Sequence, residues 1–283
     1  MQDNIRKRKS ILITGCSSGI GYATARHLSQ RGWDVFAACR RAEDCERLRS
    51  EGFRSLILDY DKEVTIERAV DDVLNQTDGE LYAVFNNGAY AIPGAVEDLS
   101  TDALRAIFQS NLFGWHKLTT LAIPVMRERG EGRIIQCSSV LGFAALKMRG
   151  SYQATKFALE GLTDTLRLEL RGSNIHVVLI EPGPITTKFR ENAYARFCEW
   201  IDVEKSFWRG VYKDRLIPRL EDLQRKDKYE LDADSVAAKV LCALESHKPL
   251  VRYPVTFPTY FLRLAKRVCT NKQFDSICSK VSE

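Results

Sequence analysis

The sequence of 283 residues lacks several features that would place it in a specialised class of protein. Its eight cysteines include no Cys-x-x-Cys pair, and no apolar run is long enough to span a membrane. Its four histidines are scattered singly along the chain, so no cluster of metal ligands is evident. No secretory signal is recognisable at the N-terminus. These absences favour a cytoplasmic protein with neither a metal site nor a disulfide framework.

The composition is that of an ordinary globular protein, with 45% hydrophobic and 28% charged residues. The net charge of +5 is modest, and part of it lies in the run Arg6-Lys7-Arg8-Lys9. We interpret this run as a solvated leader, with membrane or nucleic-acid contact as the weaker alternative. The composition therefore predicts no nucleic-acid partner. The length allows either one large α/β domain or two small ones.

Short apolar runs alternate with amphipathic stretches over the first 180 residues. The predicted strands are 11–13, 34–39, 55–58, 81–85, 133–137 and 175–180. The predicted helices begin at 20, 42, 64, 102 and 152, and the fourth continues to 129 with a kink at Pro124. Repeated alternation of this kind predicts an α/β fold, a doubly wound parallel sheet of the Rossmann type with helices on both faces. We expect a single domain over residues 1–283.

A glycine-rich turn joins the first predicted strand to the first helix, with the spacing Gly15-x-x-x-Gly19-x-Gly21. The N–H groups and positive dipole end of a helix that begins after such a turn form a phosphate site. The spacing is not the common Gly-x-Gly-x-x-Gly. Ser17 also sits in a Gly-x-Ser-x-Gly match, the nucleophile elbow of serine hydrolases, but that elbow normally follows several strands. A turn without a ligand is the third interpretation.

Tyr152 and Lys156 lie four residues apart in a strongly helical stretch, so their side chains share one face. A nearby ammonium favours the phenolate and lowers the tyrosine pKa from about 10. Ser139 ends the fifth predicted strand, on the same rim of the sheet as the start of that helix. Asn111 lies inside the predicted helix 102–129, where it either holds a water against Lys156 or faces solvent.

Together these motifs resemble those of the short-chain dehydrogenase/reductase family. The residues that carry the resemblance are Thr14-Gly15-x-x-x-Gly19-x-Gly21, Asn86-Asn87-Gly88, Asn111, Ser139, Tyr152-x-x-x-Lys156 and Pro182-Gly183, with thirteen residues from Ser139 to Tyr152. The resemblance covers about residues 8–255. Within the family the chain is similar to the branch of NADP-dependent aldehyde reductases and 17β-hydroxysteroid-dehydrogenase-like proteins, also at Arg252-Tyr253-Pro254.

One loop departs from the family pattern. After the fourth predicted strand the family usually has Asn-Asn-Ala-Gly, whereas this chain has Asn86-Asn87-Gly88-Ala89. Any positive φ that the glycine supplies is therefore expected one residue earlier.

The resemblance implies roles for particular residues. Tyr152 would be the general acid for reduction, Lys156 would hold the nicotinamide ribose, Ser139 would bind the carbonyl oxygen and Asn111 would anchor a proton-relay water. The expected cofactor-binding residues, which include Tyr152 and Lys156, are Gly15, Ser17, Ser18, Gly19, Ile20, Arg40, Arg41, Asp59, Asn87, Gly88, Pro182, Gly183, Ile185 and Thr187.

The end of the second predicted strand bears on the choice of cofactor. Enzymes that use NAD typically carry an acidic side chain there, which accepts from the ribose 2′-OH. This chain has Arg40 and Arg41 instead, and guanidinium groups suit a 2′-phosphate. We therefore predict NADP(H), with Arg40 as the larger contributor. The alternative is that both arginines simply begin a solvated helix.

The segment 188–230 interrupts the alternation of strands and helices and carries seven aromatic residues between Phe189 and Tyr212. We expect a helical lid over an apolar carbonyl or alcohol substrate, such as an aldehyde, a ketone or a steroid- or retinoid-like molecule. The alternative is that these aromatic side chains pack in ordinary helices. In the C-terminal extension, 254–283, the basic amphipathic stretch 256–268 indicates weak contact with a membrane surface or docking.

The sequence thus predicts an oxidoreductase that transfers a hydride between NADP(H) and a small apolar substrate. The family resemblance also implies a homodimer or homotetramer, paired through the helices that carry Asn111 and Tyr152. Two rival functions remain. The first is a non-catalytic NADP(H)-binding sensor of the same fold, and the second is a serine hydrolase that uses Ser17.

Overall fold

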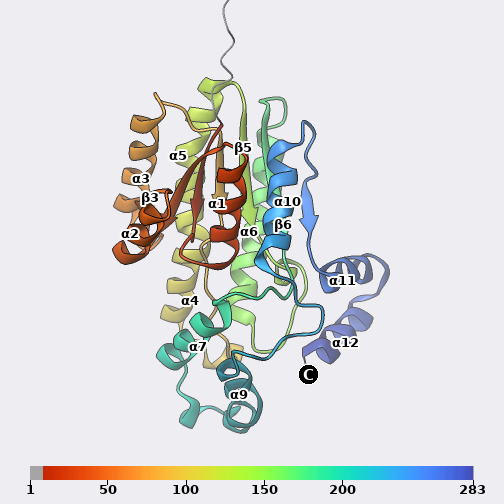
Figure 1. The fold of residues 1–283 in the computed structure, drawn as a ribbon. Coiled ribbons are helices and arrows are strands. Elements are labelled where there is room, and N and C mark those ends of the chain that lie inside the picture. The colour runs from red at the N-terminus through yellow and green to blue at the C-terminus, as the bar shows by residue number, and fades with distance from the viewer. Residues whose placement is uncertain (1–8, 283) are drawn as a thin grey trace, which may run out of the picture.

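The computed structural model describes residues 9–282, so Arg6, Lys7 and Arg8 of the basic run lie outside the described residues. Seven parallel strands in this part of the chain form one sheet, in the order β3-β2-β1-β4-β5-β6-β7 (Figure 1). The strands are β1 Ser10–Thr14, β2 Asp34–Cys39, β3 Arg54–Ile57, β4 Ala83–Asn86, β5 Gly132–Cys137, β6 Ile175–Glu181 and β7 Arg252–Pro254. The predicted α/β fold is confirmed.

Helices cover both faces of the sheet. They are α1 Gly19–Gln30, α2 Ala42–Ser50, α3 Glu63–Gln76, α4 Thr101–Phe108, α5 Gly114–Arg129, α6 Gly150–Glu169, α7 Phe189–Trp200, α8 Arg209–Val211, α9 Ile217–Glu221, α10 Ala233–Glu245, α11 Phe257–Val268 and α12 Asn271–Ser282. Helices α1 and α10 lie side by side on one face, and α3 packs against α5 on the other (Figure 1). Between residues 9 and 282, no helix has the length and apolarity needed to cross a bilayer.

The strands are apolar because the helices bury both of their faces. All five residues of β1 are buried, and Phe36 and Phe85 on the adjacent strands are fully inaccessible. Cys16 and Cys39 are free thiols in this core, where they pack as small apolar side chains.

The predicted helix 102–129 is confirmed, because the chain is helical without a break over residues 101–129. A π-helical turn, Gln109–Phe113, which the sequence did not predict, lies between α4 and α5 and contains Asn111. Close packing follows directly after this turn, because a Cβ on Gly114 would lie 2.5 Å from the Cβ of Tyr60. Such single π-turns inside helices often accompany functional sites.

The aromatic residues of the segment 188–230 mostly build a second hydrophobic core. Phe197 and Tyr212 are fully buried and meet edge to face, with ring centres 5.4 Å apart. The Tyr212 hydroxyl accepts the Ala95 N–H at 2.8 Å and also bonds to Asp98. Of the seven aromatic residues, all of which the structure describes, only Phe189 lines the central cavity. The expectation of an aromatic lid surface is therefore wrong for the other six.

The C-terminal extension is fastened to the sheet by a cluster of ion pairs. Glu181, at the end of β6, is completely buried. It pairs with Arg252 at 3.3 Å and with Arg263 of α11. Arg252 also pairs with Glu160 at 3.0 Å and Asp164 at 2.7 Å, both on α6. The cluster thus joins β6, β7, α6 and α11.

Candidate active site

A cavity of about 660 Å³ opens at the carboxyl ends of the strands. Most of the predicted site residues line it: Gly15, Ser17, Ser18, Gly19, Ile20, Asn87, Gly88, Ser139, Tyr152, Lys156, Pro182, Gly183, Ile185 and Thr187. Four other predicted residues do not line the cavity, namely Arg40, Arg41, Asp59 and Asn111.

The glycine turn is shaped by close backbone contacts. Gly15 and Gly19 have φ angles of +67° and +57°, in the left-handed region that other residues rarely adopt. A Cβ on Gly15 would lie 2.7 Å from the Cα of Gly88, and one on Gly21 would lie 2.5 Å from the Gly15 carbonyl oxygen. Only glycine allows the turn to sit this close to both α1 and the loop after β4.

Thr14 connects the turn to the loop after β4. Its hydroxyl oxygen accepts the N–H groups of Asn87 at 2.9 Å and Gly88 at 3.2 Å. The Asn87 side-chain amide donates in return to the Thr14 carbonyl at 3.0 Å. Tyr60, which the sequence analysis did not single out, donates its hydroxyl to Thr14 at 2.8 Å. Its position directly after the third predicted strand was the available signal.

The altered order Gly88-Ala89 does not create the expected positive φ. Neither residue has a φ in the left-handed region. A Cβ on Gly88 would lie 3.4 Å from the Cα of Gly15, which is a tight but ordinary contact. The order Gly88-Ala89 therefore places a glycine where the loop packs against Gly15. It does not strain the backbone of the loop.

The start of α1 is suited to an anionic group. Its first turn has no acidic side chain, and the Ser18 side chain makes no capping hydrogen bond. Ser18, Gly19 and Ile20 line the cavity, so the helix N-terminus faces that space. These residues fit the pyrophosphate of a dinucleotide.

Ser17 does not have the surroundings of a hydrolase nucleophile. Within residues 9–282, no hydrogen bond joins it to a histidine, and His27 is bonded to Asp234 at 2.7 Å instead. Arg47, which the sequence analysis missed, donates to the Ser17 carbonyl at 2.7 Å and so holds the turn in place.

Three predicted catalytic side chains meet at the inner end of the cavity. Ser139 follows β5, and Tyr152 and Lys156 lie on the first two turns of α6. The Ser139 side chain is near enough to Tyr152 to act on its pKa, and its hydroxyl oxygen accepts the Leu141 N–H at 3.1 Å. The Lys156 ammonium donates to the Cys137 carbonyl at 2.7 Å and lies 4.0 Å from the centre of the Trp115 ring. The carbonyl and the ring both favour the charged ammonium.

Burial dominates the protonation of this group. It raises the pKa of the Tyr152 phenol above its usual value of 10, and the nearby Ser139 hydroxyl opposes this increase. It also lowers the pKa of Lys156 to about 8. The expectation that Lys156 lowers the Tyr152 pKa is therefore wrong for the protein alone, in which the ammonium is 5.5 Å from the centre of the tyrosine ring.

Asn111 is fully buried, so the solvent-facing alternative is wrong. Its side-chain amide donates to the Tyr90 carbonyl at 2.8 Å, and its side-chain oxygen accepts the Tyr90 N–H at 3.2 Å. A longer bond of 3.3 Å reaches Thr155 on α6. The side chain ties the π-turn to the loop after β4, and its role in anchoring a water stays a prediction.

Comparison with known proteins identifies the family. Residues 9–196 match the model of the short chain dehydrogenases. The chain belongs to the short-chain dehydrogenase/reductase family. It is 39% identical over 270 residues to the uncharacterized oxidoreductase YbbO of Escherichia coli K12, a match that covers 95% of this chain and 94% of YbbO.

Two further relatives agree with this assignment. Mitochondrial D-beta-hydroxybutyrate dehydrogenase of Mus musculus is 30% identical over 276 residues, which cover 90% of this chain and 79% of that enzyme. A solved short-chain dehydrogenase from Streptomyces avermitilis has a TM-score of 0.77 and 26% identity, with 98% of each chain covered. The protein is thus an oxidoreductase that uses a nicotinamide cofactor and acts on a small molecule.

The arginines expected to select the cofactor lie outside the cavity of this short-chain dehydrogenase, at the end of β2. Arg41 is exposed and pairs with Asp44 at 3.0 Å. Arg40 is exposed too and forms no ion pair with any residue from 9 to 282. Asp59, at the end of the neighbouring β3, accepts the Asp61 N–H at 3.2 Å. Arg40 is therefore the freer of the two arginines.

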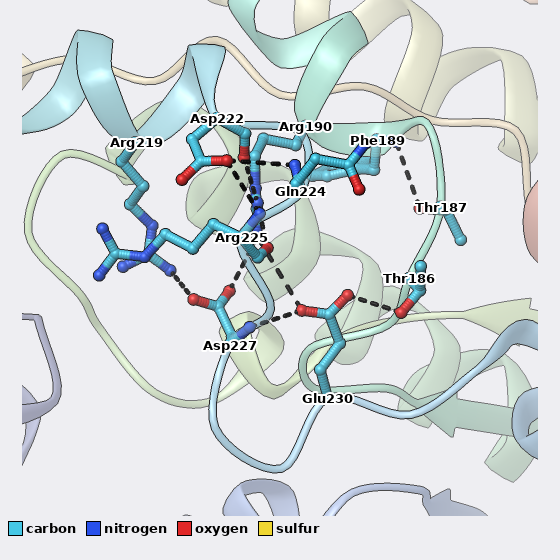
Figure 2. Close-up of polar contacts among 10 residues, drawn as sticks. All are labelled: Thr186, Thr187, Phe189, Arg190, Arg219, Asp222, Gln224, Arg225, Asp227 and Glu230. Carbon is cyan, nitrogen blue, oxygen red and sulfur yellow. Dashed lines mark hydrogen bonds and ion pairs between the residues drawn. The ribbon is translucent and has the colours of Figure 1, made fainter.

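The opposite side of the cavity in this dehydrogenase is charged, which the sequence analysis did not foresee. Figure 2 shows the network of polar contacts around Arg190. The Arg190 guanidinium lies 3.4 Å from the Asp227 carboxylate. Arg219 pairs with the same carboxylate at 2.8 Å. Glu230 accepts the Thr186 hydroxyl and the Asp227 N–H, both at 2.7 Å. These bonds fasten the loop 222–230 to the segment that follows β6.

Proposed function

We propose that this dehydrogenase transfers a hydride between NADP(H) and the carbonyl or alcohol carbon of an aldehyde or ketone. The observation that carries the proposal is that Ser139, Tyr152 and Lys156 line the same cavity as the glycine turn. When bound, the nicotinamide cofactor supplies or accepts the hydride. The protein must then move one proton at the carbonyl oxygen and exclude water.

Tyr152 is the residue that moves this proton. Burial keeps the phenol protonated at neutral pH, so it can donate to the oxygen of a carbonyl that is being reduced. Ser139 lines the same cavity as Tyr152 and orients the substrate oxygen toward the phenol. Lys156, one turn further along α6, supplies the positive charge that stabilises the phenolate left behind. Asn111 anchors the water through which that proton is replaced.

The preference for NADP(H) rests on the end of β2. Arg40 is free to bind the 2′-phosphate, whereas Arg41 is engaged with Asp44. Asp59 follows the adjacent strand and would lie beside the adenine of the bound cofactor.

We propose an aliphatic aldehyde or ketone as the substrate, as expected for the aldehyde reductase and 17β-hydroxysteroid-dehydrogenase-like branch. A cavity of about 660 Å³ suits a molecule of this size, up to a steroid or retinoid. Apolar side chains supply part of the lining, namely Val140, Leu141, Leu146, Phe189, Leu220 and Leu223. The names of the relatives include a hydroxy-acid dehydrogenase, which also fits a substrate of this reaction type.

The test is to incubate the protein with NADPH and each of a panel of aldehydes and ketones, and to monitor the consumption of NADPH by its absorbance. The proposal is supported if the wild type reduces any of these substrates and a Tyr152 variant does not. Binding of NADPH without turnover of any substrate would support the non-catalytic sensor instead.

Two surfaces support proposals about partners. Phe113, at the end of the π-turn before α5, and Phe157 on α6 are half exposed, which supports pairing into a homodimer or homotetramer through these helices. On α11, an exposed apolar stripe supports weak contact with a membrane surface: Phe257, Tyr260, Phe261, Leu264 and Val268. All eight cysteines are free, which supports a location in the reducing cytoplasm.

A further inference from the structure

Arg149 is a charged side chain in the cavity that the proposed reaction does not use. It precedes α6 directly as its N-cap residue and lines the cavity. Its one hydrogen bond goes to the carbonyl of its own neighbour, Met148, at 3.1 Å. Among residues 9–282, no carboxylate lies within ion-pair distance of its guanidinium. Four of the five N–H donors of the guanidinium thus have no partner in the protein.

The groups around Arg149 do not neutralise it. Arg149 is partly exposed, and desolvation by the protein around its guanidinium lowers its pKa to about 10. The nearest charged groups that act on it are Arg219, Asp227 and Arg190. Asp227 already forms ion pairs with both other arginines, at 2.8 Å from Arg219 and 3.4 Å from Arg190 (Figure 2). Arg190 also has Glu230 at 3.9 Å, so two of the three guanidinium groups have a carboxylate within ion-pair distance, and Arg149 is the one of the three without such a partner.

The backbone around Arg149 holds it in a defined place. The Met148 carbonyl accepts the Gly94 N–H at 3.1 Å, and the Ser151 hydroxyl donates to the Ile92 carbonyl at 2.6 Å. Met148 has a φ of +62°, an uncommon conformation for a residue with a side chain, and the flanking bonds maintain it. Arg149 thus has a fixed starting point from which to reach into the cavity.

We propose that Arg149 binds a carboxylate carried by the carbonyl substrate, so that the preferred substrate is an oxo acid. This inference rests on the proposed function and specifies its substrate class. A carboxylate matches the fork of a guanidinium and supplies the missing counter-charge. Arg149 is the N-cap residue of α6 and Tyr152 lies in its first turn, three residues later, and both line the same cavity. One small molecule can therefore reach both residues, with its carbonyl at Tyr152 and its carboxylate at Arg149.

A monoanion fits this place better than a phosphate dianion. The carboxylate of Asp227 acts on the same guanidinium, so it repels any second anion there. This repulsion grows with the charge of the ligand. The leucine side chains of the lining, among them Leu146 and Leu223, can pack on the carbon chain between the two polar ends.

The test compares matched substrates that differ only in charge, 4-oxobutanoate and its methyl ester, with NADPH as the cofactor. Because a hydrogen bond to a charged group contributes about tenfold to a hundredfold in affinity, we expect kcat/KM to favour the acid by about that factor. Arg149→Met should abolish this preference and leave turnover of the ester within about threefold. Arg149→Lys, which keeps the charge but loses the fork, should retain part of the preference.

The control is Arg68→Met, which replaces an exposed arginine on α3. This variant should have the wild-type kcat/KM for both substrates. Turnover of both substrates without preference for the acid would overturn the inference while leaving the proposed function intact. If neither substrate is turned over, calorimetry of succinate binding to the complex with NADP⁺ decides. If succinate binds to the wild type and not to Arg149→Met, the result supports the carboxylate site. If it binds equally to both proteins, or to neither, the inference is overturned. Melting temperatures show whether the variants are folded.

Discussion

The two sides of the cavity are built in different ways. The side toward the sheet consists of glycines, small polar residues and backbone groups, fixed by contacts such as those of Thr14 with Asn87 and Gly88. The side formed by residues 186–230 consists largely of long charged side chains that bind one another, with Arg190 and Asp227 at the centre. The first side admits almost no substitution without steric conflict. The second can change its residues while keeping the chain in place.

This difference separates the chemistry from the choice of substrate. A cofactor and a proton donor need positions fixed to a fraction of an ångström, which close-packed backbone provides. Recognition of the rest of the substrate needs particular charges and shapes, which side chains on a loop provide. We therefore expect substitutions on the sheet side to affect turnover, and substitutions on the loop side to affect substrate binding.

The largest effect should come from Tyr152→Phe on the sheet side. The change removes one oxygen from a buried ring, and loss of a general acid should lower kcat by about 10²-fold or more. Binding of NADPH, measured by fluorescence titration, should remain. Tyr260→Phe on the exposed face of α11 is the matched control and should have wild-type activity. A Tyr152→Phe enzyme with most of its activity would refute the proposed mechanism.

Next in size is the effect of Arg40→Asp on the choice of cofactor. The wild type should have a higher kcat/KM with NADPH than with NADH, because Arg40 favours the 2′-phosphate. Reversal of the charge should invert the preference, with a change of about tenfold or more, since hydrogen bonds to charged groups contribute about 1.5–3 kcal/mol each. Arg41→Asp should do less, because Asp44 already engages Arg41. Equal use of NADH by the wild type would show that the assignment is wrong.

The pH dependence tests the sheet side without a substitution. Burial lowers the pKa of Lys156 from 10.5 to about 8, so its charge is present below that pH and is lost above it. The kcat/KM for NADPH reports groups of the free enzyme, so it should be constant near neutral pH and fall above about pH 8. Initial rates across a pH series would measure this. A constant kcat/KM up to pH 10 would contradict a role for the charged ammonium.

The smallest effect should come from Asp227→Asn on the loop side. The change weakens the bonds to Arg190 and Arg219, which are partly exposed pairs that contribute about 1 kcal/mol or less each. With an uncharged aldehyde, KM should rise by a factor of about two to five, while kcat and the affinity for NADPH stay unchanged. Steady-state kinetics and cofactor titration measure the three quantities. A loss confined to kcat would break the proposed division between the two sides.

The sequence predicted the sheet side well because the constraints there are local. Strand, glycine turn and helix follow one another within twenty residues, and Tyr152 and Lys156 share a face through helical spacing alone. The π-helical turn at Asn111 was not predictable in this way, because it accompanies packing of Gly114 on Tyr60, which is remote in sequence.

The loop side escaped prediction for the same reason. Arg190 and Asp227 are 37 residues apart, and nothing in their local pattern indicates that they pair. The aromatic residues of the segment were visible in the sequence, but whether they face a cavity or a second core depends on Ala95 and Asp98, more than a hundred residues earlier.

The ion-pair cluster at Glu181 also bears on where the folding unit of this chain ends. The family model stops at residue 196, yet the buried Glu181 carboxylate has one of its two cations, Arg263, in α11. Breaking a buried ion pair from one side costs about 3–5 kcal/mol, a large share of the total stability of a typical domain. We therefore infer that the chain unfolds cooperatively through α11. A truncation before Arg263 should weaken the sheet itself, because it strips a counter-ion from the end of β6.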